Sequence, residues 1–260
     1  MIDVADVKTI PVEVKDIILN SFESLPISVV NEIKSTEIQY PCDVMCAIED
    51  RYSPRGNINF YDKLISTLGK YDIVCFHSTK MLSKDCILEH GLKVNDWERY
   101  RKNLIMVYRT LGYAEDKIEK AIDIVNHEYK RKYSGEREGS QLYFYSNLSM
   151  LESEYAPAYD QFCESIGGEL ARWALKTQYP ELYKPLKENG NGFVVKFKMP
   201  FANIAYYEKD SIAYHFVLYY AGIYFWNKEF EIEFDGNTQC NIPPEDILEI
   251  IQYDKEIDYE

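Results

Sequence analysis

Two short stretches of the chain alternate strictly between apolar and polar side chains, and this pattern constrains the fold more than any other feature. In Gly192–Met199, aromatic and aliphatic residues occupy every second position, and Pro200 ends the run. In Lys228–Phe234, two phenylalanines and an isoleucine alternate with three glutamates. Because successive side chains of a strand point to opposite faces, both stretches are predicted to be half-buried β-strands.

Other apolar runs follow either a strand or a helix pattern. Tyr71–His77 and Gln141–Ser146 are short, rich in β-branched or aromatic residues, and predicted to be strands. Helical spacing of apolar residues predicts helices over Val12–Ser21, Tyr61–Leu68, Ser83–Gly91, Glu98–Gly135 and Tyr159–Leu175. Short strands separated by helices, without regular βαβ alternation, predict an α+β fold.

Glycines are expected to shape two of the predicted helices. Gly91 is the expected stop of the helix over Ser83–Gly91. In the last predicted helix, Gly167-Gly168 is expected to be a kink or a close-packing site. The inward face of that helix is predicted to consist of Phe162, Ile166, Leu170 and Trp173.

The same patterns predict the organisation of the chain. Residues 1–70 are expected to form a helix-rich N-terminal extension. Residues 71–260 are expected to form one domain, into which a charged helical segment, residues 98–138, is inserted.

The net charge of the chain argues against general binding along nucleic acids. The 260 residues carry 29 Lys plus Arg against 43 Asp plus Glu, a formal net charge of −14, so the chain is not expected to coat DNA or RNA. The charge is unevenly distributed: Glu98–Glu138 holds 10 bases and 8 acids, whereas Glu229–Glu260 holds 11 acids and one base. A local nucleic-acid acceptor near the basic insert therefore remains open.

The sequence also bears on compartment and metals. The start of the chain has no secretory pattern and no segment has the apolar length of a membrane span, so a cytoplasmic protein without a membrane partner is expected. Cys42 and Cys46 form a single CxxxC, which is half of a zinc site without a matching second half. The six cysteines are therefore predicted to be reduced and mostly buried, and no metal is expected.

Residues that could carry chemistry occur at three places. The chain lacks GxSxG, GxxxxGK[ST], GxGxxG and HExxH. His77 ends the first predicted strand, where sites are often built. Tyr143 and Phe144 lie on the second strand, and a tyrosine ring is suited to stacking on a planar heterocycle. Glu229, Glu231 and Glu233 share one face of the last predicted strand.

In chain order, these features resemble the ADP-ribosyltransferase superfamily of the diphtheria-toxin and poly(ADP-ribose)-polymerase type, marked by a His, a Tyr and a Glu on successive strands. The first motif is Phe76-His77-Ser78-Thr79 with Ile87-Leu-Glu-His-Gly91-Leu92 after it. The second is Gly139-Ser-Gln-Leu-Tyr143-Phe144, followed by Tyr155-Ala156. The third is Lys228-Glu229-Phe230-Glu231-Ile232, followed by Ile242-Pro-Pro-Glu-Asp-Ile247. The resemblance covers residues 71 to 250.

The resemblance implies a split antiparallel or mixed sheet flanked by helices and a mono-ADP-ribosyltransferase that uses NAD without a metal. It implies that His77 hydrogen-bonds a ribose hydroxyl, that Thr79 holds the adenosine side and that Tyr143 stacks on nicotinamide. Ser78, Phe144 and Tyr155 complete the implied NAD-binding set. Glu229 is the best match for the catalytic carboxylate, and Glu231 would form an E-x-E pair with it, as in relatives that modify arginine.

The resemblance leaves the acceptor open. A macromolecular acceptor, protein or nucleic acid, fits a toxin or defence effector of bacteria or phages, with an antitoxin or regulatory partner. One alternative is an RNA 2′-phosphotransferase, for which Arg99, Arg101 and Arg109 offer positive charge near the first motif. The other is a non-enzymatic interaction or immunity module.

Overall fold

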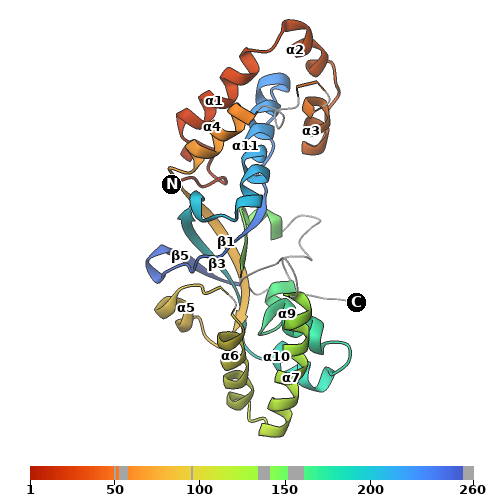
Figure 1. The fold of residues 1–260 in the computed structure, drawn as a ribbon, viewed down its shortest axis with the longest axis vertical. Helices are drawn as coiled ribbons and strands as arrows, with labels where there is room; N and C mark the ends of the chain where they lie inside the picture. The colour runs from red at the N-terminus through yellow and green to blue at the C-terminus, as the bar shows by residue number, and fades with distance from the viewer. Residues whose placement is uncertain (50, 53–57, 95, 134–140, 152–160, 254–260) are drawn as a thin grey trace. The chain divides into compact units, whose positions relative to one another are not determined.

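Helices and one five-stranded sheet make up the part of the chain that the computed structural model describes, residues 1–49, 51–52, 58–94, 96–133, 141–151 and 161–253. The strand order is β4-β2-β1-β3-β5. Strand β3 pairs with β5 in antiparallel register, and the two lie side by side in Figure 1. The strands are β1 (Asp72–Met81), β2 (Leu142–Tyr145), β3 (Asn191–Pro200), β4 (Asp235–Thr238) and β5 (Ile247–Tyr253). The predicted α+β class and the first three strands are confirmed. The prediction that His77 ends its strand is wrong, because β1 continues to Met81.

The helices follow apolar periodicity where it is strong. The predicted helix over Glu98–Gly135 is two helices, because Gly112 adopts a φ of 78° in the turn between them. Gly91 ends α5 with a φ of 69°, as predicted. The helices are α1 (Val12–Glu23), α2 (Ile27–Lys34), α3 (Pro41–Glu49), α4 (Ile58–Leu68), α5 (Asp85–His90), α6 (Trp97–Thr110), α7 (Glu115–Lys132), α9 (Gly168–Leu175), α10 (Pro180–Glu188) and α11 (Tyr206–Trp226).

Contacts divide the chain into two compact units, each assembled from separate stretches. Unit 1 consists of Met1–Cys75, Tyr145–Asn147 and Lys198–Asn237. Unit 2 consists of Phe76–Phe144, Leu148–Phe197 and Thr238–Glu260. The division predicted from the sequence, with an extension over residues 1–70, a domain over 71–260 and an insert over 98–138, stays a prediction.

Unit 1 is organised around α11. This helix is buried on several faces, and α1, α2, α3 and α4 all pack against it. Phe22 of α1, for example, lies 5.1 Å from Phe225 between ring centroids. A helix that is apolar all round can be covered on every side, which is why α11 serves as the core of this unit.

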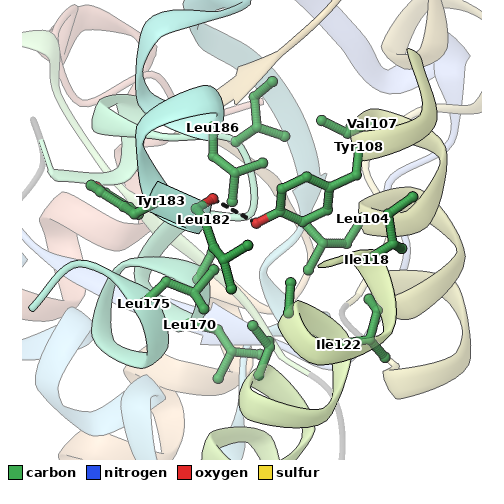
Figure 2. Close-up of a cluster of buried hydrophobic side chains, with 14 of the residues drawn as sticks. Leu104, Val107, Tyr108, Ile118, Ile122, Leu170, Leu175, Leu182, Tyr183 and Leu186 are labelled. Atoms are coloured by element: carbon green, nitrogen blue, oxygen red, sulfur yellow. Dashed lines mark hydrogen bonds between the residues drawn. The ribbon is translucent and has the colours of Figure 1, made fainter. Parts of the chain in front are cut away.

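Unit 2 has a helical core formed by α6, α7, α9 and α10 (Figure 2). Tyr108 is fully buried at its centre, and its hydroxyl donates a hydrogen bond of 2.7 Å to the Leu182 carbonyl. Burial raises the pKa of Tyr108, so the hydroxyl stays protonated and keeps donating. The apolar stripe expected on the charged insert is buried here, at Ile118, Ala121, Ile122 and Val125.

Two predictions of local structure are wrong. Lys228–Phe234 is extended but is not a strand, since β4 begins only at Asp235. The predicted alternation of buried and exposed side chains is present, since Ile232 and Phe234 are buried. These side chains face α11, however: the ring of Phe234 lies 6.4 Å from that of Phe216 and 6.1 Å from that of His215, between centroids. An extended chain has the same period of two whether it packs on a helix or pairs in a sheet.

The predicted helix over Tyr159–Leu175 is interrupted at its glycine pair. Gly167 and Gly168 have φ values of 87° and 56°, and α9 begins only at Gly168. The kink is confirmed. Because the helix restarts there, Trp173 is 49% exposed, and its predicted inward position is wrong.

Candidate functional site

His77 lies on β1 and contacts the neighbouring strand β2. Its Nδ1 is 2.8 Å from the carbonyl oxygen of Tyr143. A carbonyl oxygen can only accept, so Nδ1 carries a proton; in the neutral ring, Nε2 is then an acceptor. Burial lowers the pKa of His77, and the hydrogen bond to Tyr143 opposes this effect only in part. The structure therefore holds a neutral histidine whose Nε2 can accept from a hydroxyl group.

Alternation along β1 and β2 separates the other predicted NAD-binding residues. Thr79 lies on the same face of β1 as His77, whereas Ser78 points to the opposite face and is buried. On β2, Tyr143 is 38% exposed and Phe144 is buried. His77, Thr79 and Tyr143, which we name the strand-borne group, are the residues with accessible chemistry; contacts of Ser78 and Phe144 with NAD stay predictions.

Tyr143 is held by its polar tip and covered in part by a cation. Its hydroxyl donates a hydrogen bond of 2.9 Å to Oε1 of Gln141. The ammonium of Lys132 lies 5.9 Å from the centre of its ring. The other tyrosine of the second motif, Tyr155, lies outside the described residues.

The stretches after the first and third motifs are joined in unit 2. Leu92 and Ile242 exchange two backbone hydrogen bonds of 2.9 Å. The preceding residue must be glycine, because a Cβ on Gly91 would overlap the Ile242 carbonyl and its φ is 69°. The structure thus brings together two of the sequence stretches that carry the resemblance.

The turn after α11 fixes the start of the segment Lys228–Phe234, which we name the glutamate segment. The indole Nε1 of Trp226 donates to the Thr36 carbonyl at 2.9 Å, and the Lys228 ammonium donates to the Ile38 carbonyl. Asn227 adopts the left-handed conformation with a φ of 53°. The chain then doubles back along α11, and Gly222 makes room for it: a Cβ there would lie 2.8 Å from the Lys228 carbonyl oxygen.

The glutamates of this segment have different neighbours. Glu229 and Glu231 are exposed, and Glu233 is partly buried. Burial, and secondly the charge of Glu229, raises the pKa of Tyr219 on α11, which places the Glu229 carboxylate within electrostatic reach of that hydroxyl. Oε2 of Glu231 accepts a long hydrogen bond of 3.4 Å from Nδ2 of Asn147.

The predicted catalytic residues therefore fall into two sets. His77 and Tyr143 meet within unit 2 through a direct hydrogen bond. Glu229 and Glu231 belong to unit 1, where Glu231 accepts from Asn147.

The cysteines are only partly as predicted. All six are free; Cys75 and Cys163 are buried, but Cys42, Cys46 and Cys86 are exposed, so the expectation of mostly buried thiols is wrong. Cys42 and Cys46 both lie on α3, one turn apart. Among the described residues, no group of three or more His, Cys, Asp or Glu could hold a metal ion.

Sequence reasoning missed two charged clusters of unit 2. The Glu164 carboxylate is almost completely buried, with the Lys176 ammonium at 2.9 Å and that of Lys187 at 3.9 Å. The other cluster joins Lys132 to Glu169. Neither has a signal in the sequence, because charged residues in a charged helical region usually face solvent.

Comparison with known proteins gives no match: no family model, no curated protein and no solved structure corresponds to this chain. In the described part of the chain, no helix combines the length and apolarity needed to cross a membrane. The function must therefore be argued from the residues of the chain itself.

Proposed function

We propose that the protein is a NAD-dependent mono-ADP-ribosyltransferase with an ADP-ribosyltransferase-like sheet, acting in the cytoplasm on a macromolecular acceptor. The observation that carries the proposal is the hydrogen bond between His77 Nδ1 and the Tyr143 carbonyl. In the neutral ring, this bond leaves Nε2 as an acceptor on a residue that contacts the backbone of a partly exposed tyrosine. The junction of Leu92 with Ile242 supports the same reading, because it joins two motif stretches that are far apart in the sequence.

The strand-borne group supplies the chemistry that NAD requires at two points. A ribose hydroxyl can donate to His77 Nε2, because that nitrogen carries no proton. The Tyr143 ring offers a flat face for the nicotinamide ring. Thr79, on the same face of β1 as His77, offers a hydroxyl for the adenosine side.

The glutamate segment supplies the negative charge for bond cleavage. As the bond between nicotinamide and the ribose breaks, its electron pair leaves with nicotinamide and positive charge develops on the ribose. A fixed carboxylate of Glu229 or Glu231 stabilises that charge more in the transition state than in the ground state. A nucleophilic atom of the acceptor then bonds to the ribose carbon and loses its proton.

The test is transfer of label from NAD to proteins or nucleic acids of a cell lysate. We expect Glu229→Gln to lower the rate about a hundredfold, as loss of one preorganised electrostatic group commonly does. Glu231→Gln and Glu233→Gln remove the same charge from the same segment, and both should keep most of the activity; a loss in Glu233→Gln alone would assign the role to Glu233. Label transfer that is equal in wild type and Glu229→Gln would contradict the role of Glu229, and a loss in Glu231→Gln alone would assign the role to Glu231.

The RNA 2′-phosphotransferase alternative has less support. Arg109 makes a bidentate ion pair with Glu115, with hydrogen bonds of 2.8 and 2.9 Å, and Arg99 lies 3.5 Å from the Asp96 carboxylate. Arginines neutralised in this way attract an RNA phosphate less strongly than free ones. Nothing in the structure favours the interaction module over the enzyme; calorimetry with NAD separates them, because a module without a nucleotide site gives no heat of binding.

A further inference from the structure

Lys132, the last residue of α7, is enclosed by aromatic rings. Its ammonium lies 5.3 Å from the centre of the Trp173 ring, 5.8 Å from that of Tyr133 and 5.9 Å from that of Tyr143. It also forms an ion pair with the Glu169 carboxylate, and its side chain is only 10% exposed. We name these four partners, Tyr133, Tyr143, Glu169 and Trp173, the lysine cage; all belong to unit 2.

The cage has the chemistry of a cation-binding site. Aromatic ring faces carry negative electrostatic potential and attract a cation within about 6 Å of their centres, most strongly when it is withdrawn from water. The Glu169 carboxylate adds a formal negative charge. Sites that bind organic cations combine the same elements, so Lys132 occupies a place suited to a ligand.

The cage is also accessible from outside. Trp173 is 49% exposed and Tyr143 38% exposed, although both rings contact Lys132. A cation in the place of the Lys132 ammonium would therefore meet two partly exposed rings. The side chain of Lys132 is flexible, so it can move away from both rings.

We propose that Lys132 is an internal occupant of an organic-cation site and that the positively charged nicotinamide ring of NAD displaces it from Tyr143 and Trp173. The identity of this cation rests on the proposed function, whereas the site itself rests on the cage. Two positive charges repel on the same ring faces, so the lysine and the nicotinamide ring exclude each other. Lys132 therefore lowers affinity, and Trp173 contributes a second ring to the site.

The experiment follows the fluorescence of Trp173 during titration with two probes, the N-methylated nicotinamide cation and NAD. The variants are Lys132→Ala and, as a matched control, Lys130→Ala, which removes the same charge from an exposed position of α7. Trp173→Phe identifies the signal of Trp173 against those of Trp97 and Trp226. We expect Lys132→Ala to bind both probes about fivefold more tightly than wild type, from the loss of competing cation–π contacts, and Lys130→Ala to match wild type.

The outcomes separate the two proposals. Tighter binding of the methylated cation to Lys132→Ala, with no binding of NAD to any variant, supports the cation site and overturns the proposed function. Equal binding of NAD to wild type and Lys132→Ala supports the proposed function and overturns the internal occupant. Weaker binding of both probes to Lys132→Ala also overturns it, since Lys132 would then help to hold the ligand.

Discussion

The strand-borne group and the glutamate segment are held in place by different means. His77 and Tyr143 lie on β1 and β2, neighbouring strands in the interior of the sheet order, and a side chain of one bonds to the backbone of the other. The glutamate segment is not a strand; it lies along α11 and depends on individual contacts of Trp226, Lys228, Gly222 and Ser146. A ladder of hydrogen bonds tolerates the loss of one contact better than an extended segment does.

The largest effect is expected from Gly222→Ala, which tests the packing of the glutamate segment on α11. The new Cβ would lie 2.8 Å from the Lys228 carbonyl oxygen and 3.0 Å from the Phe230 ring, so the segment must move. We expect a loss of about 3 kcal/mol in the free energy of unfolding, typical of overpacking, measured by urea denaturation. Gly69→Ala, where an added Cβ comes no nearer than 3.3 Å to another atom, is the control. Equal stability of both variants would show that the segment adjusts freely.

A smaller effect is expected from Ser146→Ala, at the point where β2 ends beside the glutamate segment. The buried Ser146 hydroxyl accepts from the Phe234 N–H at 2.9 Å, and the Ser146 N–H donates to the Phe234 carbonyl at 2.9 Å. Without the hydroxyl, the Phe234 N–H loses this partner, so a loss of about 1.5 kcal/mol is expected. Thermal or urea unfolding measures it, with Ser24→Ala at an exposed hydroxyl as control. No difference between the two variants would remove Ser146 as a support of the segment.

The smallest effect concerns the strand-borne group and depends on pH. Because the pKa of His77 is lowered in the folded state, the unfolded chain takes up a proton first as the pH falls below the ordinary value of 6.5. The contribution of His77 to the free energy of unfolding is therefore fully present above pH 6.5. It decreases as the pH falls toward the lower pKa of the folded state. His77→Asn keeps a donor for the Tyr143 carbonyl and should lose less stability than wild type between pH 7.5 and 5.5.

Urea denaturation at the two pH values gives this difference. His127→Asn, at an exposed position of α7, is the control and should follow wild type. If His77→Asn loses as much stability as wild type, His77 does not stay neutral in the folded protein.

The spacing of apolar residues predicts the type of element correctly where that spacing fits only one kind of packing. The apolar stripe of α7 and the alternation of β3 both led to the correct element. The same alternation in Lys228–Phe234 led to the wrong one, because period two identifies an extended chain but not what lies beneath it. The converse holds for α11: from Ile212 to Phe225, buried residues lie on several sides of the helix, so they follow no helical period.

The candidate site was predictable to a similar extent. His77 and Tyr143 stand out as a histidine and an aromatic residue on short strands, and the structure places them in contact. Lys132 and Glu169 do not stand out, since their pairing depends on how α7 and α9 cross and on the break at Gly167. The exposure of Trp173 has the same origin: a helix that restarts after a glycine pair presents a different face.

The assembly of unit 1 from distant stretches sets the order of events during synthesis. The apolar faces of α1 and α4 are completed by α11, which the ribosome makes only after all of residues 76–197. At ordinary translation rates this delay is on the order of ten seconds. During that time, Phe22 of α1 lacks Phe225 of α11, against which it packs in the finished structure. The nascent chain is therefore exposed to chaperones and proteases for longer than its finished structure suggests, and shortening the segment between the two halves of unit 1 would reduce that exposure.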